Sequence, residues 1–184
     1  MQIKKISQSS GVVATVVQNT TSTSQIDVPS VNAVKDSLQK HIVTANQSGR
    51  PTLNIGTTYG TTKMPFDGSD VIGTKLTFDN ANDRIVVGSG VSKVKVSGKM
   101  NVWSTPAAPI SEVDSQIKKN TTTISACLQS RITGMGFNDE VLSEKSVTVS
   151  SGDYIEMWLL CSSSGNYAII GDGNATYLTV EVVE

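Results

Sequence analysis

The final third of the chain decides the fold. Residues 147–161 read Val-Thr-Val-Ser-Ser-Gly-Asp-Tyr-Ile-Glu-Met-Trp-Leu-Leu-Cys, and residues 176–184 read Thr-Tyr-Leu-Thr-Val-Glu-Val-Val-Glu. Both stretches are rich in β-branched and aromatic residues, which favour strands. A Gly152-Asp153 pair, typical of a tight turn, leads into the first strand, and a polar loop of Ser, Gly and Asn follows it. The sequence therefore predicts a chain whose last two strands belong to a β-sheet.

The composition points to a mainly β protein. Of the 184 residues, 38% are apolar and only 5% aromatic, and the net charge is −1. This usage suits half-exposed strands joined by many turns. The near-zero charge argues against a nucleic-acid groove. The apolar run at residues 12–17 is too short for a signal peptide or a membrane span, so we expect synthesis in a cytosol and no membrane insertion.

From residue 64 onward, strand signals recur at short and regular spacing. The clearest lies at residues 91–103, where Val94, Val96 and Met100 alternate with polar residues. Further strands are predicted at residues 75–78, 84–87, 123–132 and 141–149, the last as a pair. Residues 104–119 contain two prolines and are predicted to form a long loop. About eight to ten such strands predict a β-sandwich of the jelly-roll type over residues 64–184.

The N-terminal residues 1–25 are predicted to form an extended arm and linker. Their apolar side chains are too few to bury one another, so we expect them to bind another protein. The predicted anchoring residues are Ile3, Ile6, Val12, Val13, Val16 and Val17.

Residues 26–47 carry a helical pattern that peaks between Val31 and Val43. Ser30 suits the N-cap position, and an apolar stripe follows at helical spacing. A helix of about 13 residues is marginal alone, so the stripe needs a partner. A short parallel coiled coil is one interpretation; an amphipathic helix packed on its own domain is the other. The stripe consists of Val31, Val34, Leu38 and Ile42. Residues 48–63 are predicted to form a linker, with a short strand at residues 52–55.

The predicted strand at residues 154–160 has large side chains on both faces. A sandwich strand needs only one apolar face, so a loop or another chain must cover the second. We predict that Tyr154, Trp158 and Leu160 contact another copy of the chain; cover by a loop is the alternative.

The sequence offers little for catalysis or for a bound cofactor. The single histidine, His41, has no carboxylate and nucleophile at a useful spacing. Cys127 and Cys161 lie in apolar strand signals, as buried thiols or as a disulfide. Clusters of Asp and Asn at residues 79–83 and 172–174 match turns better than a calcium loop, although a metal ion there stays open. We expect a protein that is not an enzyme and carries no cofactor.

Two stretches carry a family resemblance. Residues 148–158, the polar loop after them and residues 176–183 resemble the end of the trimeric jelly rolls of the complement-component and tumour-necrosis-factor type. Such domains also form the tips of bacteriophage fibres. Residues 26–36, Ile-Asp-Val-Pro-Ser-Val-Asn-Ala-Val-Lys-Asp, resemble a short Pro-Ser-x-x-Ala-Val helix that trimerises just before the β domain in phage tail-fibre and head-fibre proteins.

The resemblance implies a structural protein of a bacteriophage virion, made in the host cytoplasm. It would be a homotrimeric head fibre or decoration protein whose arm binds the major capsid protein or another virion protein. Its β domain would bind a host-surface glycan or protein. A tail or baseplate receptor-binding protein is an alternative with the same fold. A carbohydrate-binding module or carbohydrate-active enzyme is an alternative of a different class.

Overall fold

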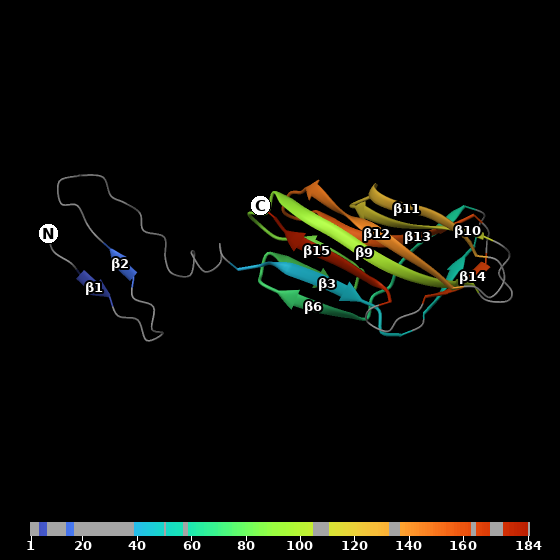
Figure 1. Ribbon diagram of the computed structural model, residues 1–184, viewed down its shortest axis with the longest axis horizontal. Coiled ribbons are helices and arrows are strands. Elements are labelled where there is room, and N and C mark those ends of the chain that lie inside the picture. The colour runs from blue at the N-terminus through green and yellow to red at the C-terminus, as the bar shows by residue number, and fades with distance from the viewer. Residues whose placement is uncertain are drawn as a thin grey trace. The chain divides into compact units, whose positions relative to one another are not determined.

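The computed structural model describes residues 4–6, 14–16, 39–49, 51–56, 59–104, 111–132, 137–162, 165–169 and 175–183. The chain divides into two compact units, Met1–Leu38 and Gln39–Glu184. The first contains an antiparallel hairpin of β1 (Lys4–Ile6) and β2 (Ala14–Val16). The second contains two larger sheets (Figure 1). None of the described residues forms a helix, so none forms one that could cross a bilayer.

The six-stranded sheet is built around β13. Its order is β11-β10-β13-β8-β7. β5 also pairs with β13, at the end of that strand opposite to the end that pairs with β8. Its strands are β5 (Gly60–Lys63), β7 (Leu76–Asp79), β8 (Arg84–Val87), β10 (Ser111–Lys119), β11 (Thr122–Ile132) and β13 (Tyr154–Cys161).

The seven-stranded sheet is built around β9. Its order is β4-β14-β9-β15-β3-β6, and β12 pairs with the other edge of β9. Its strands are β3 (Ile42–Asn46), β4 (Thr52–Ile55), β6 (Gly68–Ile72), β9 (Lys93–Ser104), β12 (Phe137–Thr148), β14 (Gly165–Ile169) and β15 (Tyr177–Val182). Figure 1 shows β9, β15, β3 and β6 side by side. All these pairings are antiparallel, as a jelly roll requires.

The core lies between the two sheets and follows the period of two expected of strands. Ile155, Met157 and Leu159 of β13 are fully buried, as are Leu178 and Val180 of β15. Burial of each such side chain contributes about 1.5–3 kcal/mol relative to exposure.

Gly98 of β9 makes room for the opposite sheet. A Cβ at this position would lie 2.4 Å from Met157 Cε and 2.9 Å from the Tyr177 carbonyl oxygen. The absent side chain lets the terminal methyl of Met157 reach the backbone of the seven-stranded sheet.

Several strands confirm the sequence prediction. The alternating stretch at residues 91–103 forms β9, and the stretch at residues 123–132 forms β11. The two terminal strands are β13 and β15. The short strand predicted at residues 52–55 is β4. Residues 141–149 do not form a pair of strands, because they continue a single strand, β12.

The prediction that the helix extends to Val43 is wrong. Ile42 lies in β3, which pairs with β15 and β6, and its burial alternates along the strand. The consecutive β-branched residues Ile42, Val43 and Thr44 favour a strand, and two neighbouring strands supply the hydrogen bonds. The compact β domain therefore begins near residue 39 and not at residue 64. The rest of the expected helix, including Val31, Val34 and Leu38, lies outside the described residues.

Three further strands occupy stretches predicted to be loops or linker. Residues 111–119 form β10, which lies between β11 and β13. Only Val113 and Ile117 give β10 an apolar face, with Ser115 between them, so its alternation is weak. Residues 60–63 form β5, and the polar loop after β13 contains β14. Each is held by backbone pairing to a neighbour and not by its own pattern.

A polar clasp joins the turn before β13 to the β10–β11 turn. Asn120 Nδ2 donates to Asp153 Oδ1 over 2.9 Å, and the Tyr154 N–H donates to Asn120 Oδ1 over 3.0 Å. The Ser150 N–H donates to Asp153 Oδ2 over 2.9 Å, and Lys119 lies 3.4 Å from the same oxygen. These donors, the Asn120 amide above all, hold the pKa of Asp153 below its usual value.

The clasp predicts a pH-dependent contribution to stability. Because folding lowers the pKa of Asp153, its contribution is present above the unfolded-state pKa and is lost as pH falls through the folded one. Asp153→Asn should lower the free energy of unfolding by about 1 kcal/mol at pH 7 and by less at pH 2. Urea titrations at both pH values measure this. Asp70→Asn, at an exposed carboxylate of β6, is the control; an equal loss in Asp153→Asn at both pH values would contradict the prediction.

The loop between β6 and β7 closes over a buried histidine. His41 is 5% exposed, and its Nδ1 accepts a hydrogen bond from the Thr74 N–H over 3.0 Å. Gly73 has a φ of 80°, and a Cβ there would lie 2.0 Å from His41 Nδ1. Glycine at position 73 therefore meets both a backbone and a packing requirement.

Gly73→Ala should lower the free energy of unfolding by about 2 kcal/mol or more, because backbone strain and a clash act together. Gly152→Ala shares the positive φ, but its Cβ would meet nothing within 4 Å, so it should cost about 1 kcal/mol. Gly56→Ala has neither problem and should be near neutral. Thermal and urea unfolding of the three variants test this ranking. If the free energy of unfolding falls equally in Gly73→Ala and Gly152→Ala, the clash with His41 does not contribute.

Candidate functional surfaces

The outer side of the six-stranded sheet is the first candidate surface, and we call it the Trp158 face. Since Ile155, Met157 and Leu159 point into the core, the residues between them point outward. Cross-strand register places the outward residues of β10 and β5 beside those of β13. The face comprises Tyr154, Glu156, Trp158 and Leu160 of β13, Asp114, Gln116 and Lys118 of β10, and Lys63 of β5.

Trp158 lies at the centre of a network of charged groups. Its Nε1–H donates to Glu156 Oε2 over 3.0 Å. Lys118 Nζ lies 4.2 Å from the centre of the indole ring, within the range of a cation–π contact. Glu156 is only 7% exposed and its other oxygen lies 3.4 Å from Lys63 Nζ. The indole is thus half-buried by side chains of its own chain.

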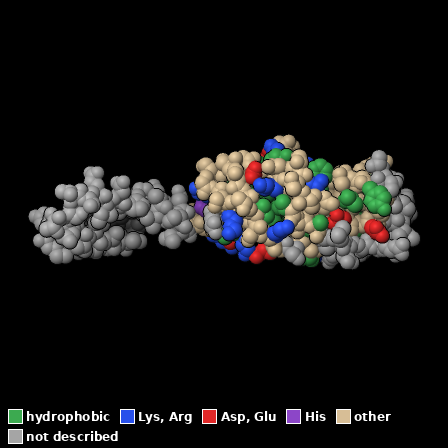
Figure 2. Space-filling view, turned by 90° about the horizontal axis from the view of Figure 1, so that it is seen from above, with side chains coloured by type: hydrophobic (Ala, Val, Ile, Leu, Met, Phe, Trp, Pro, Cys, Tyr) green, Lys and Arg blue, Asp and Glu red, His purple; other side chains and the backbone are tan. Residues whose placement is uncertain are grey.

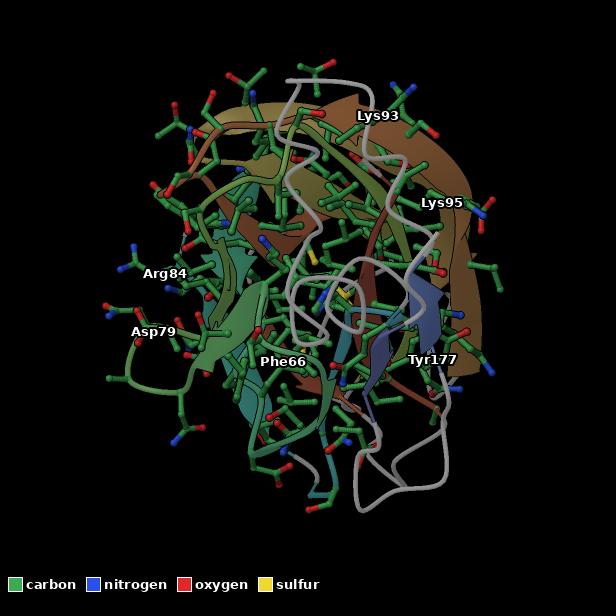
Figure 3. All side chains as sticks on the ribbon, turned by 90° about the vertical axis from the view of Figure 1, so that its left-hand side faces the viewer. Phe66, Asp79, Arg84, Lys93, Lys95 and Tyr177 are labelled. Carbon is green, nitrogen blue, oxygen red and sulfur yellow. The ribbon has the colours of Figure 1, made fainter. Side chains whose placement is uncertain are left out.

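Tyr154 is covered in a similar way. The Arg84 guanidinium lies 4.7 Å from the centre of the tyrosine ring, and Arg84 Nε donates to Asp79 Oδ2 over 2.9 Å. The pKa of Asp79 is lowered mainly by its hydrogen bond from Asn82 and then by Arg84. Figure 3 shows Asp79 and Arg84 on one side of the sandwich, with Lys95 and Tyr177 on the other.

Asp114 is the unusual residue of the Trp158 face. It is 7% exposed, and its Oδ2 accepts a hydrogen bond of 2.7 Å from Gln116 Nε2. Its Oδ1 is buried, and no described residue forms a hydrogen bond with it. Burial raises the pKa of Asp114, and the bond from Gln116 only partly opposes this. A carboxylate in this position costs free energy, because its desolvation is not fully compensated.

The outer side of the seven-stranded sheet is the second candidate surface, and we call it the Tyr177 face. Leu178 and Val180 point inward, so Tyr177 and Thr179 point outward. Thr179 Oγ1 lies 3.0 Å from Thr44 Oγ1, within hydrogen-bond distance. By register the face spans five strands and comprises Ile42 and Thr44 of β3, Ile72 of β6, Lys95, Ser97 and Lys99 of β9, Val141 of β12, and Tyr177, Thr179 and Glu181 of β15.

The Tyr177 face exposes apolar side chains between charged ones. Ile72 is 52% exposed and Val141 60% exposed, and Val183, just beyond β15, is 43% exposed. Lys95 pairs with Glu144 at 2.8 Å, and Lys40 pairs with Glu181 at 3.0 Å. The side of the domain drawn in Figure 2 likewise shows small apolar areas separated by lysines and acidic side chains.

The structure brings together some of the residues predicted from the sequence. Tyr154, Trp158 and Leu160 lie on one face, as their spacing in a strand requires. Ile42 lies on the opposite sheet, so it shares no surface with them. Of the predicted anchoring residues, Ile6 and Val16 lie in β1 and β2, whereas Ile3, Val12, Val13 and Val17 lie outside the described residues.

Sequence reasoning missed the polar partners of the Trp158 face. Asp114 and Lys118 stood in a stretch predicted to be a loop, and only their register with β13 gives them a role. The alternation of Val113, Ser115 and Ile117 was the one available signal.

Other groups with possible chemistry are accounted for by the fold. His41 is buried, and its Nδ1 accepts a hydrogen bond from the Thr74 N–H. Cys161 is buried in the core, and the side chain of Cys127 lies outside the described ones. Within the described part, no three His, Cys, Asp or Glu side chains lie close enough together to hold a metal ion.

Comparison with solved structures identifies the fold. The structure of Eiger TNF from S. frugiperda matches with a TM-score of 0.54 and 9% identity, covering 79% of this chain and 92% of that one. Murine APRIL at pH 5.0 matches with a TM-score of 0.55 and 10% identity, covering 78% and 99%. The chain has a tumour-necrosis-factor-like jelly roll. No protein-family model and no curated protein sequence matches the chain, so the similarity establishes the jelly roll and not an activity.

The buried carboxylate of this jelly roll gives a further prediction. Because folding raises the pKa of Asp114, its penalty appears as pH rises above the unfolded-state value. Asp114→Asn should therefore raise the free energy of unfolding by about 1 kcal/mol at pH 7, with the gain shrinking below about pH 4. Urea unfolding from pH 3 to pH 8 measures this. Glu112→Gln, at an exposed carboxylate of the same strand, is the matched control; a loss of stability in Asp114→Asn at pH 7 would show that the carboxylate is satisfied.

Proposed function

We propose that the protein is a homotrimeric structural protein of a bacteriophage virion. It is a head fibre or decoration protein whose N-terminal unit binds the capsid and whose jelly roll is displayed for attachment to the host surface. It acts by binding and not by catalysis.

The observation that carries this proposal is a tumour-necrosis-factor-like jelly roll that follows a separate N-terminal unit. Residues 26–36, which resemble the trimerising helix of phage fibre proteins, lie in that N-terminal unit, just before the β domain. A binding role also agrees with the polar and aromatic character of the Trp158 face.

The exposure of apolar side chains favours the Tyr177 face as the contact between copies. Ile72, Val141 and Val183 are each more than two-fifths exposed, and each lies on or beside that face. Trp158 and Tyr154, by contrast, lie under Lys118 and Arg84 of the same chain. Burial of apolar surface is the main source of stability in oligomers that do not separate. We therefore place the trimer contact on the Tyr177 face, which leaves the Trp158 face to meet a ligand.

Three copies on one stalk explain how weak sites suffice. Once one jelly roll has bound the host surface, the second and third bind at a high effective concentration. Threefold symmetry presents the three sites in the same orientation.

The same fold would serve a tail or baseplate receptor-binding protein, and only the virion partner of the N-terminal unit separates the two roles. The alternative of a carbohydrate-active enzyme requires paired carboxylates in a cleft. Sugar release from a polysaccharide would favour it.

The trimer contact can be tested with matched charge substitutions. Val141→Asp and Ile72→Asp should shift the full chain from trimer toward monomer in sedimentation equilibrium at micromolar concentration, because each would bury an unpaired carboxylate. Trp158→Ala should leave the trimer intact. Thermal unfolding of each variant shows that it still folds. A trimer lost in Trp158→Ala but kept in Val141→Asp would place the contact on the Trp158 face, and a wild-type monomer would contradict the trimer altogether.

The anchoring role can be tested by truncation. Removing residues 1–24 should abolish co-sedimentation with virions while leaving a soluble trimer. The full chain added to virions that lack the protein is the control. Attachment by the truncated chain would contradict the proposed role of the N-terminal unit.

A further inference from the structure

We propose that the Trp158 face binds neutral sugar rings of a host-surface polysaccharide, with Trp158 as the stacking platform and Asp114 as an acceptor for sugar hydroxyls. The inference rests on the proposed adhesive function and places the ligand on the outer side of the six-stranded sheet.

Asp114 supplies the first observation. Asp114 is only 7% exposed on the outward side of β10, and its Oδ1 has no hydrogen-bond partner among the described residues. A buried polar atom without a hydrogen bond lowers the stability of the fold. Proteins keep such atoms most often at functional sites. The amide of Gln116, which donates to the other oxygen, is itself half-buried. A sugar hydroxyl that takes the place of this amide would donate to Oδ2 in its stead.

The charge balance of the face selects a neutral ligand. The two negative charges of Asp114 and Glu156 are balanced by the two positive charges of Lys63 and Lys118. A strongly charged ligand would leave one sign unpaired on a partly desolvated surface, which is unfavourable. A hydroxyl-rich neutral ligand can donate to the carboxylates and accept from the lysines at once.

Trp158 supplies the platform. The bond from its Nε1–H to Glu156 fixes the orientation of the indole and satisfies its polar edge. The face of the ring then remains for apolar contact, and the C–H face of a pyranose ring fits it. Lys118 now occupies that position at 4.2 Å. A cation–π contact on a partly exposed surface is weak, so the lysine can turn aside and donate to a sugar oxygen.

Gln116 connects the two parts of the site. It is the cross-strand neighbour of Trp158 and the hydrogen-bond donor to Asp114. Its Oε1 accepts a hydrogen bond of 3.2 Å from Thr123 Oγ1. A sugar ring stacked on Trp158 would therefore have Gln116 and the Asp114 carboxylate along one edge. The competing explanation is structural, with a water molecule satisfying Asp114 Oδ1 and no role in binding.

The test is affinity electrophoresis of the full-length protein in native gels that contain dextran, laminarin or galactomannan. Polygalacturonate serves as the charged polysaccharide. We expect at least one neutral polysaccharide to retard the wild type, and polygalacturonate to have no such effect. Trp158→Ala should raise the dissociation constant derived from the retardation about tenfold or more. Trp158→Phe, which keeps an aromatic ring, should have a dissociation constant within about threefold of the wild-type value. Asp114→Asn should weaken binding about threefold or more, although we predict it to be the more stable protein.

Each outcome is decisive for the inference. Wild-type binding that is unchanged in Trp158→Ala, or no binding to any of the three neutral polysaccharides, would overturn it. Equal binding by Asp114→Asn would reduce Asp114 to a structural residue and overturn its part. Sedimentation of the same samples and their attachment to virions test the proposed function separately. An intact, attached trimer without sugar binding would thus reject this site alone.

Discussion

The two sheets of this protein are held together by one shared hydrophobic core, in which Met157 of β13 packs against Gly98 of β9, and the arrangement of the domain depends on this burial. Met157 reaches across the sandwich to the backbone at Gly98, where a side chain of any size would collide with it. β9 also pairs with β12, β14 and β15, whereas β13 pairs with β5, β8 and β10. These two strands therefore fix the position of most other strands in both sheets.

The core also determines what each sheet presents outward. Since alternate residues of a strand point to opposite faces, the choice of Ile155 and Met157 for the core places Glu156 and Trp158 on the surface. The outer sides of the two sheets differ in how their large side chains are covered. On the six-stranded sheet the aromatic rings lie beneath cations of the same chain. On the seven-stranded sheet Ile72 and Val141 remain exposed. This difference is the physical basis of our proposal that one face contacts other copies of the chain and the other binds a ligand.

The predictions from sequence succeeded where a strand's own pattern was strong. The alternation in β9 and the apolar residues of β13 and β15 mark a half-buried strand without reference to any neighbour. They failed for β3, β10 and β14. Ile42 fits both a helical stripe and a strand, and its pairing with β15 decides between them. Ser115 interrupts the apolar face of β10, so only its two neighbouring strands hold that segment in place. The Trp158 face was seen only in part, because most of its polar partners lie about forty residues earlier in the chain, in β10, a strand that the pattern did not reveal.

The sequence by itself determined the β class, the strand at the chain's end, and the fact that residues 154–160 carry large side chains on both faces. These are local properties, set by residue type and a period of two. The tertiary structure decided which side chains cover that second face and which hydrophobic side chains remain exposed. It also decided which buried carboxylate oxygen forms no hydrogen bond with the described residues. Such features arise from cross-strand register and sheet packing between residues far apart in the chain, and no local pattern encodes them.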